Sequence, residues 1–127
     1  MKILLVDHSL VIRDRLCRII AALPAILAVA QADSEVSARQ QVLDCLPALV
    51  VIDPCLRSGN GFSLIAQLKS VQPAATVMVL TNMVFPEYRA KCMELGADYF
   101  FDKSKETAAF GTQLGKLCAS APWAARV

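Results

Sequence analysis

The sequence predicts one α/β domain built on a doubly wound, five-stranded parallel sheet. The first reason is a set of short, continuously apolar runs, such as residues 48–52, which are typical of strands buried on both faces. The second is that stretches with helical spacing separate these runs. Strands that alternate with helices favour a parallel sheet with right-handed crossovers.

The expected elements follow in order along the chain. We expect strands at residues 3–6, 25–30, 48–52, 76–81 and 99–101. Helices are expected at residues 10–23, 62–71, 86–95 and 105–119, with another between a cap at Asp33 or Ser34 and Pro47. Ser9 and Ser104 are expected to cap the first and last helices. Gly111 and Gly115 are expected to interrupt the last helix.

Composition narrows the class of protein. The chain has 127 residues, 56% of them hydrophobic, and a net charge of +2, so it can form a core and lacks the basic footprint of a nucleic-acid binder. No apolar run reaches the roughly 18 residues of a membrane span, and the first run stops at Asp7, too early for a signal peptide. Five cysteines without a CxxC pair indicate reduced thiols in a cytoplasmic protein.

Polar residues stand where four of the predicted strands end. Asp7, Asp53, Thr81 and Lys103 each close an apolar run, and Pro54 ends the third strand because it cannot donate to a ladder. Ligands of open α/β sheets bind at the carboxyl ends of the strands, which share one edge. The four side chains are therefore expected to converge. The alternative for each is an ordinary strand-end residue that caps the next turn.

Those residue types together suit a phosphoryl group. Two carboxylates about 4 Å apart repel by roughly 4 kcal/mol at an effective dielectric of about 20, so a cation such as Mg²⁺ is expected beside them. Lys103 supplies a fixed positive charge, Thr81 a hydroxyl, and Cys55 and Asn82 backbone amides. Asp53 is then the candidate nucleophile, which would become an aspartyl phosphate. Alternatively, Lys103 is only an ion-pair partner of the acids.

The order and spacing of these segments resemble the receiver domain of bacterial two-component response regulators. The matching segments are residues 3–7, 12–13, 51–53, Gly61, 80–81 and 96–103. The resemblance covers residues 2–119 and implies a flavodoxin-like (βα)5 receiver fold. It implies a receiver domain at residues 1–121 and a short tail at residues 122–127, with no output domain.

For the site, the resemblance implies that Asp53 accepts a phosphoryl group from a histidine kinase or a histidine phosphotransfer protein. Asp7, Asp53 and the backbone carbonyl of Cys55 would hold Mg²⁺. Thr81, Lys103 and the backbone amide of Asn82 would contact the phosphoryl oxygens.

The resemblance also implies an output. Thr81 and Phe100 occupy the family's switch positions, and phenylalanine has no hydroxyl to keep its ring at the surface. A receiver without an output domain is not an enzyme and would signal by protein contact, through the surface from Pro86 to Lys103. Met83, Val84 and Phe85 just before it are candidates for that contact or for the core. No nucleic-acid or membrane partner is expected.

His8 departs from the family pattern, which has a second acid at this position. Loss of that charge predicts weak Mg²⁺ binding. The chain is then either a less efficiently phosphorylated receiver or a phosphorylation-independent pseudo-receiver. His8 could also join Asp7 and Asp53 around Mn²⁺, because imidazole suits transition metals, or bind no metal. A flavodoxin-like enzyme or nucleotide binder would need a Gly-rich loop after the first strand, which residues 8–11 do not form.

Overall fold

The computed structural model describes residues 2–23, 28–56 and 58–120 of the chain. The strands are β1 (Lys2–Val6), β2 (Ala28–Ala32), β3 (Leu49–Ile52), β4 (Thr76–Thr81) and β5 (Tyr99–Asp102). The helices are α1 (Leu10–Ala21), α2 (Glu35–Cys45), α3 (Gly61–Val71), α4 (Pro86–Glu94) and α5 (Thr107–Ser120). Strands and helices alternate strictly along the chain, as predicted.

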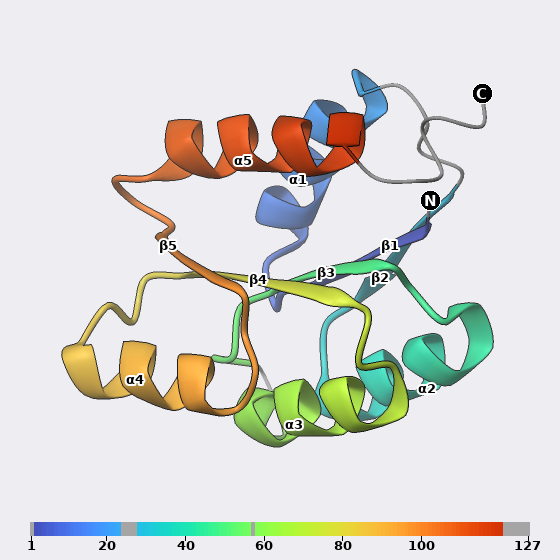
Figure 1. Cartoon of the computed structure of the whole chain (residues 1–127), viewed down its shortest axis with the longest axis vertical. Helices are drawn as coiled ribbons and strands as arrows, with labels where there is room; N and C mark the ends of the chain where they lie inside the picture. Colours follow the sequence, from blue (N-terminus) through green and yellow to red (C-terminus); the bar gives the residue numbers. More distant parts are fainter. Residues whose placement is uncertain (1, 24–27, 57, 121–127) are drawn as a thin grey trace.

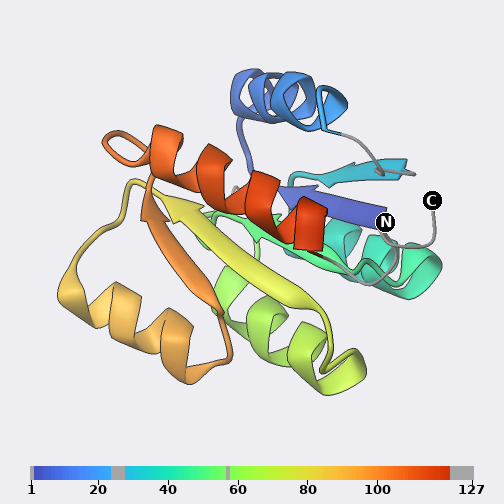
Figure 2. The ribbon, with the colours of Figure 1, turned by 45° about the horizontal axis from the view of Figure 1, so that its top comes forward.

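All five strands lie in one parallel sheet in the order β2-β1-β3-β4-β5. Helices α1 and α5 cover one face, and α2, α3 and α4 cover the other (Figure 1). The prediction of a doubly wound, five-stranded parallel sheet is confirmed. Because every strand runs the same way, the carboxyl ends of the strands meet at one edge of the sheet, reached by the arrowheads of β4 and β5 in Figure 2.

Each central strand is apolar on both faces because both faces are covered by helices. In β1, Ile3 and Leu5 pack in the cluster under α1 and α5, whereas Leu4 and Val6 pack in the cluster over α2, α3 and α4. Strands β3 and β4 alternate in the same way. This period of two explains why the sequence shows continuous apolar runs in place of an alternation with polar residues.

The second strand ends two residues later than the sequence predicted. It was expected at residues 25–30 and is found at Ala28–Ala32, while residues 25–27 of the prediction lie outside the described part of the chain. The segment Ala-Val-Ala-Gln-Ala carries little apolar signal of its own. Its carboxyl end is set by pairing with β1, in which Val6 lies opposite Ala32.

Two expectations for the last helix are wrong. Helix α5 begins at Thr107, and Ser104 does not cap it, because the Asp102 side chain accepts hydrogen bonds from the Ser104 and Lys105 amides and closes a separate turn first. Gly111 and Gly115 do not interrupt the helix. A glycine raises the cost of a helix by only about 1 kcal/mol, and packing of the buried Phe110 and Leu114 outweighs it.

The capping predictions at the other end of the chain are confirmed. Ser9 caps α1 by accepting a hydrogen bond from the Ile12 amide, and Ser34, one of two predicted candidates, caps α2. Helix α2 ends at Cys45, and its cap residue Leu46 lies in the left-handed region, with φ of 44°. Among the described residues, no helix has the length and apolar character needed to cross a membrane. The predicted tail at residues 122–127 lies outside the described part.

Candidate functional site

The sheet brings Asp7 and Asp53 to the same edge. Asp7 follows β1 and donates its backbone amide to the Ala32 carbonyl at 3.1 Å, while Asp53 follows β3 and donates to the Val6 carbonyl at 2.9 Å. The backbone hydrogen bonds between β1 and β2, and between β1 and β3, therefore continue one residue past the strands. Since β1 and β3 are neighbours in the sheet, the two carboxylates lie side by side, and both are buried.

Lys103 joins the two acids. Its Nζ atom lies 2.7 Å from Oδ2 of Asp7 and 2.7 Å from Oδ2 of Asp53, and its own amide donates to the Thr81 carbonyl at 2.9 Å. Burial alone lowers the pKa of Lys103, but the hydrogen bonds and negative charges of Asp53 and Asp7 outweigh it and hold that pKa above its ordinary value. The lysine is therefore a fixed cation between two buried anions.

The other oxygen of each carboxylate meets a backbone amide two residues along the chain. The Ser9 amide donates to Oδ1 of Asp7 at 2.8 Å, and the Cys55 amide donates to Oδ1 of Asp53 at 3.0 Å. Such short loops fix the direction of both carboxylates. The Cys55 amide, expected as a donor to a phosphoryl group, here serves the acid itself.

His8 reaches back over this cluster. Its Nδ1 atom lies 3.0 Å from the backbone carbonyl oxygen of Cys55 and 3.9 Å from Oδ1 of Asp7. One ligand atom each from Asp7, His8 and Asp53 fit within 4.8 Å of one another. Two carboxylates, an imidazole and a nearby carbonyl suit a divalent cation. The structure thus brings all four predicted metal ligands together, including His8.

Cys55 offers its backbone to this site and not its thiolate. Burial, and then the negative charge of Asp53, raise the pKa of the Cys55 thiol above its ordinary value. The thiol therefore stays protonated near neutral pH, and a thiolate nucleophile is disfavoured. All five cysteines are free, as the sequence analysis expected.

Thr81 and Asn82 lie at the end of β4, beside the cluster. The Thr81 hydroxyl is buried and accepts a hydrogen bond from the Met83 amide at 3.1 Å. The Asn82 side chain is exposed and accepts a hydrogen bond from the Ser104 hydroxyl at 2.7 Å, which ties the loop after β4 to the loop after β5. Ser104, which sequence reasoning treated as a helix cap, is therefore a loop contact.

Two contacts hold the loop after Asp53; the sequence analysis named Gly61 only as a family match and did not find Glu35 at all. A Cβ on Gly61 would lie 2.4 Å from the Cα atom of Pro54, so only glycine permits this packing. Glu35 accepts hydrogen bonds from the Asn60 amide at 2.8 Å and from the Ser63 hydroxyl at 3.0 Å. These partners are 25 and 28 residues from Glu35 in the chain, and no local pattern indicates them.

Phe100 lies inside the fold behind this edge. Phe100 is only 8% exposed, and the guanidinium carbon of Arg89, a residue of α4, lies 5.4 Å from the centroid of its ring. Before α4, Val84 and Phe85 are 45% and 57% exposed. The core alternative is therefore excluded for Val84 and Phe85, whereas Met83 is half-buried.

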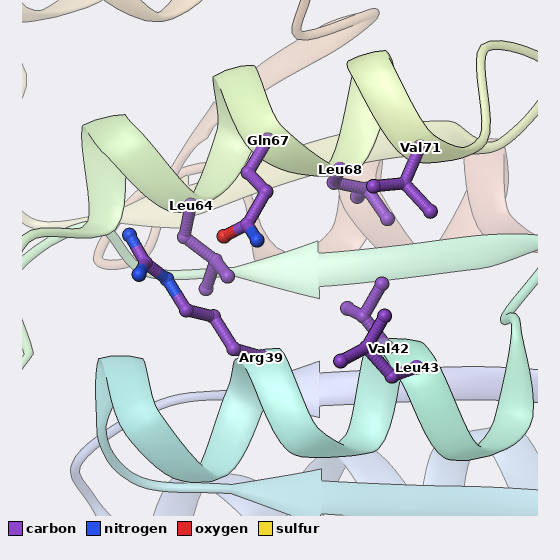
Figure 3. Close-up of a pocket in the computed structure, with 7 residues that line it drawn as sticks. All are labelled: Arg39, Val42, Leu43, Leu64, Gln67, Leu68 and Val71. Carbon is purple, nitrogen blue, oxygen red and sulfur yellow. The ribbon is translucent and has the colours of Figure 1, made fainter.

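Figure 3 shows a separate pocket between α2 and α3. Apart from Arg39 and Gln67 its lining is aliphatic: Arg39, Val42, Leu43, Leu64, Gln67, Leu68 and Val71. None of the strand-end residues lines it. The pocket therefore does not belong to the cluster of Asp7, Asp53 and Lys103.

Comparison with known proteins points to one family. A model of the response regulator receiver domain matches residues 3–113. The chain is 28% identical over 107 residues to the sensory transduction protein LytT of Enterococcus faecalis, an alignment that covers 84% of this chain and 43% of LytT. The chain thus spans less than half the length of this curated relative.

Two solved structures share the fold. A two-component response regulator of the LuxR family from Aurantimonas superposes with a TM-score of 0.82 at 24% identity, covering 98% of this chain and 92% of that one. A response regulator from Burkholderia pseudomallei, with a phosphorylated aspartic acid, a calcium ion and citrate, gives 0.80 at 24% identity and covers 93% of this chain and 68% of that one. The flavodoxin-like receiver fold is therefore confirmed.

Proposed function

The chain belongs to the response regulator receiver domain family, and we propose that Asp53 is its phosphoacceptor. The observation that carries this proposal is that Nζ of Lys103 lies 2.7 Å from both Asp7 and Asp53 at the carboxyl edge of the sheet. A candidate carboxylate nucleophile thus lies in contact with a fixed cation, which also contacts a second acid. Receiver domains are signalling modules that interact with histidine kinases or phosphotransfer proteins.

In the proposed reaction, an Asp53 oxygen forms a bond to phosphorus as the bond from phosphorus to the donor's histidine nitrogen breaks. Lys103, the Thr81 hydroxyl and the Asn82 amide would contact the phosphoryl oxygens, where positive charge and hydrogen-bond donors lower the barrier. Because Thr81 and Lys103 are already joined through their backbones at 2.9 Å, they can act on one group.

Receiver domains bind a divalent metal ion, and the residues here fit one. Asp7, Asp53 and the Cys55 carbonyl would hold it, since hard cations prefer oxygen ligands. When bound, the ion supplies positive charge that offsets the charge of the phosphoryl oxygens. The phosphorylated aspartic acid and calcium ion of the Burkholderia pseudomallei protein support this arrangement.

For output, we propose a protein contact through the surface from Pro86 to Lys103. The exposed Val84 and Phe85 at its edge offer apolar area that a partner could bury. Phe100, buried beneath Arg89, would transmit a movement of Thr81 to this surface. Because the Phe100 ring is already buried, the inward turn of this side chain can precede phosphorylation.

A second function deserves a test because His8 stands in place of an acid. Without that charge, the domain could act as a pseudo-receiver that binds its partner without phosphorylation. The fold and the Pro86 to Lys103 surface would then serve binding alone.

The deciding experiment is phosphorylation by acetyl phosphate with Mg²⁺ or Mn²⁺, followed by intact mass. We expect one added phosphoryl group on the wild type and none on Asp53→Asn. Asp44→Asn is the matched control, because Asp44 is exposed on α2 and away from the sheet edge, so it should behave as the wild type. A wild type that stays unmodified with both metals, under conditions that modify a typical receiver, would favour the pseudo-receiver.

A further inference from the structure

We propose that His8 is a metal ligand and gives this receiver a preference for a transition metal such as Mn²⁺ over Mg²⁺. This inference rests on the proposed metal site of Asp7, Asp53 and the Cys55 carbonyl. It goes beyond that site because it says how His8, which replaces an acid, changes the choice between Mn²⁺ and Mg²⁺.

The first support is the position of the imidazole. In an octahedral site with bonds of about 2.1 Å, neighbouring ligand atoms lie about 3.0 Å apart and opposite ones about 4.2 Å apart. Nδ1 of His8 lies 3.0 Å from the Cys55 carbonyl oxygen and 3.9 Å from Oδ1 of Asp7. The 3.0 Å spacing is that of neighbouring ligands on one cation, whereas 3.9 Å lies between the neighbouring and the opposite value, so His8 stands close to a ligand position.

The second support is the rigidity of the turn that carries His8. On one side Asp7 is buried and paired with Lys103. On the other side the Ser9 amide donates to Asp7 at 2.8 Å, and the Ser9 hydroxyl caps α1 through the Ile12 amide at 3.3 Å. A ligand on a fixed backbone loses little freedom on binding a metal.

The third support is charge. Asp7, Asp53 and Lys103 together carry one net negative charge, and a neutral His8 adds none. A second acid at this position would double the negative charge. Mg²⁺ depends on that charge and on oxygen ligands, so it loses affinity. A transition ion loses the same charge but gains a nitrogen ligand. Imidazole suits zinc, iron and nickel best, and Mn²⁺, although it also favours oxygen ligands, accepts a nitrogen ligand more readily than Mg²⁺ does.

The competing interpretation is that His8 binds no metal and only forms a hydrogen bond to the Cys55 carbonyl, which joins the loop after β1 to the loop after β3. A carbonyl oxygen only accepts hydrogen bonds, so a hydrogen bond at this contact requires the tautomer in which Nδ1 carries the hydrogen. To bind a metal through Nδ1, the imidazole must lose that hydrogen and adopt the tautomer in which Nε2 carries the hydrogen. His8 is 45% exposed at its side chain, so Nε2 can meet water and the exchange is accessible.

The test compares the affinities of Mn²⁺ and Mg²⁺ by calorimetry, on tag-free wild type and His8→Asp. We expect the ratio of Mn²⁺ to Mg²⁺ affinity to be at least tenfold larger in the wild type. Pulsed electron paramagnetic resonance on bound Mn²⁺ should show coupling to an imidazole nitrogen, absent from His8→Asp. His8 is the single histidine of the sequence, so this signal has one possible source.

Equal ratios in the two proteins, a wild type without nitrogen coupling, or a wild type that binds neither metal would each overturn the inference. Circular dichroism confirms that His8→Asp is folded, and His8→Ala, which removes the ligand without adding charge, should lose the nitrogen coupling as well. Selective Mn²⁺ binding by a protein that acetyl phosphate does not modify would refute the proposed phosphoryl transfer alone. Phosphorylation with equal metal ratios would refute the role of His8 alone.

Discussion

The strand-end cluster has a buried half and an exposed half, and the same two carboxylates belong to both. In the buried half, Lys103 contacts Oδ2 of Asp7 and of Asp53, and the three side chains are at most 9% exposed. In the exposed half, His8 is 45% exposed and faces Oδ1 of Asp7 and the Cys55 carbonyl. Oδ2 of both acids therefore contacts the buried Lys103, whereas Oδ1 of Asp7 faces His8 on the exposed side.

Removing the buried cation should have the largest effect on stability. Lys103→Met leaves two buried carboxylates without their partner, and we expect the free energy of unfolding to fall by about 3 kcal/mol. Urea denaturation at neutral pH measures this loss in the free energy of unfolding. His8→Ala, in the exposed half, is the matched control and should stay within about 0.5 kcal/mol of the wild type. Equal losses in the two variants would contradict the division into halves.

The loop that carries Cys55 should respond next. In Gly61→Ala, the new Cβ would lie 2.4 Å from the Cα atom of Pro54, so the loop must shift, at a cost of about 2 kcal/mol. Metal affinity should fall with stability, because the Cys55 carbonyl moves.

Gly111→Ala is the control for that substitution. Its Cβ would meet nothing within 4 Å, and alanine favours a helix, so this variant should gain about 0.5 to 1 kcal/mol. Thermal unfolding and Mn²⁺ calorimetry on both variants test the pair of expectations. A Gly61→Ala protein with wild-type metal affinity would show that the loop position does not matter for binding.

The smallest expected effect is on the pH dependence of stability. The pKa of Lys103 is raised above 10.5 in the folded protein, so its ion pairs stabilise the fold fully below that pH. The contribution is lost as the pH rises through the higher, folded-state pKa. Urea midpoints from pH 8 to pH 11.5 should therefore fall more steeply for the wild type than for Lys103→Arg, whose guanidinium stays charged. Parallel curves would refute this linkage.

The sequence analysis predicted which residues meet at the sheet edge because strand ends are local features. An apolar run followed by a polar residue marks Asp7, Asp53 and Thr81, and parallel strands bring such residues to one edge. It failed where the local signal was weak or ambiguous. Pairing with β1 set the carboxyl end of the weakly apolar β2, and the Asp102 side chain closed a turn that delayed α5 to Thr107.

The sequence by itself determined the fold class, the order of elements and the residues at the strand ends, because apolar periodicity and turn residues act over short stretches of chain. Only the tertiary structure decided how these residues meet. His8 contacts Cys55 across 47 residues and Glu35 contacts Asn60 across 25. Lys103 was expected near the acids, but only the structure shows that it contacts both at once. Such contacts depend on where the folded sheet and its loops place distant side chains in space, which no local pattern encodes.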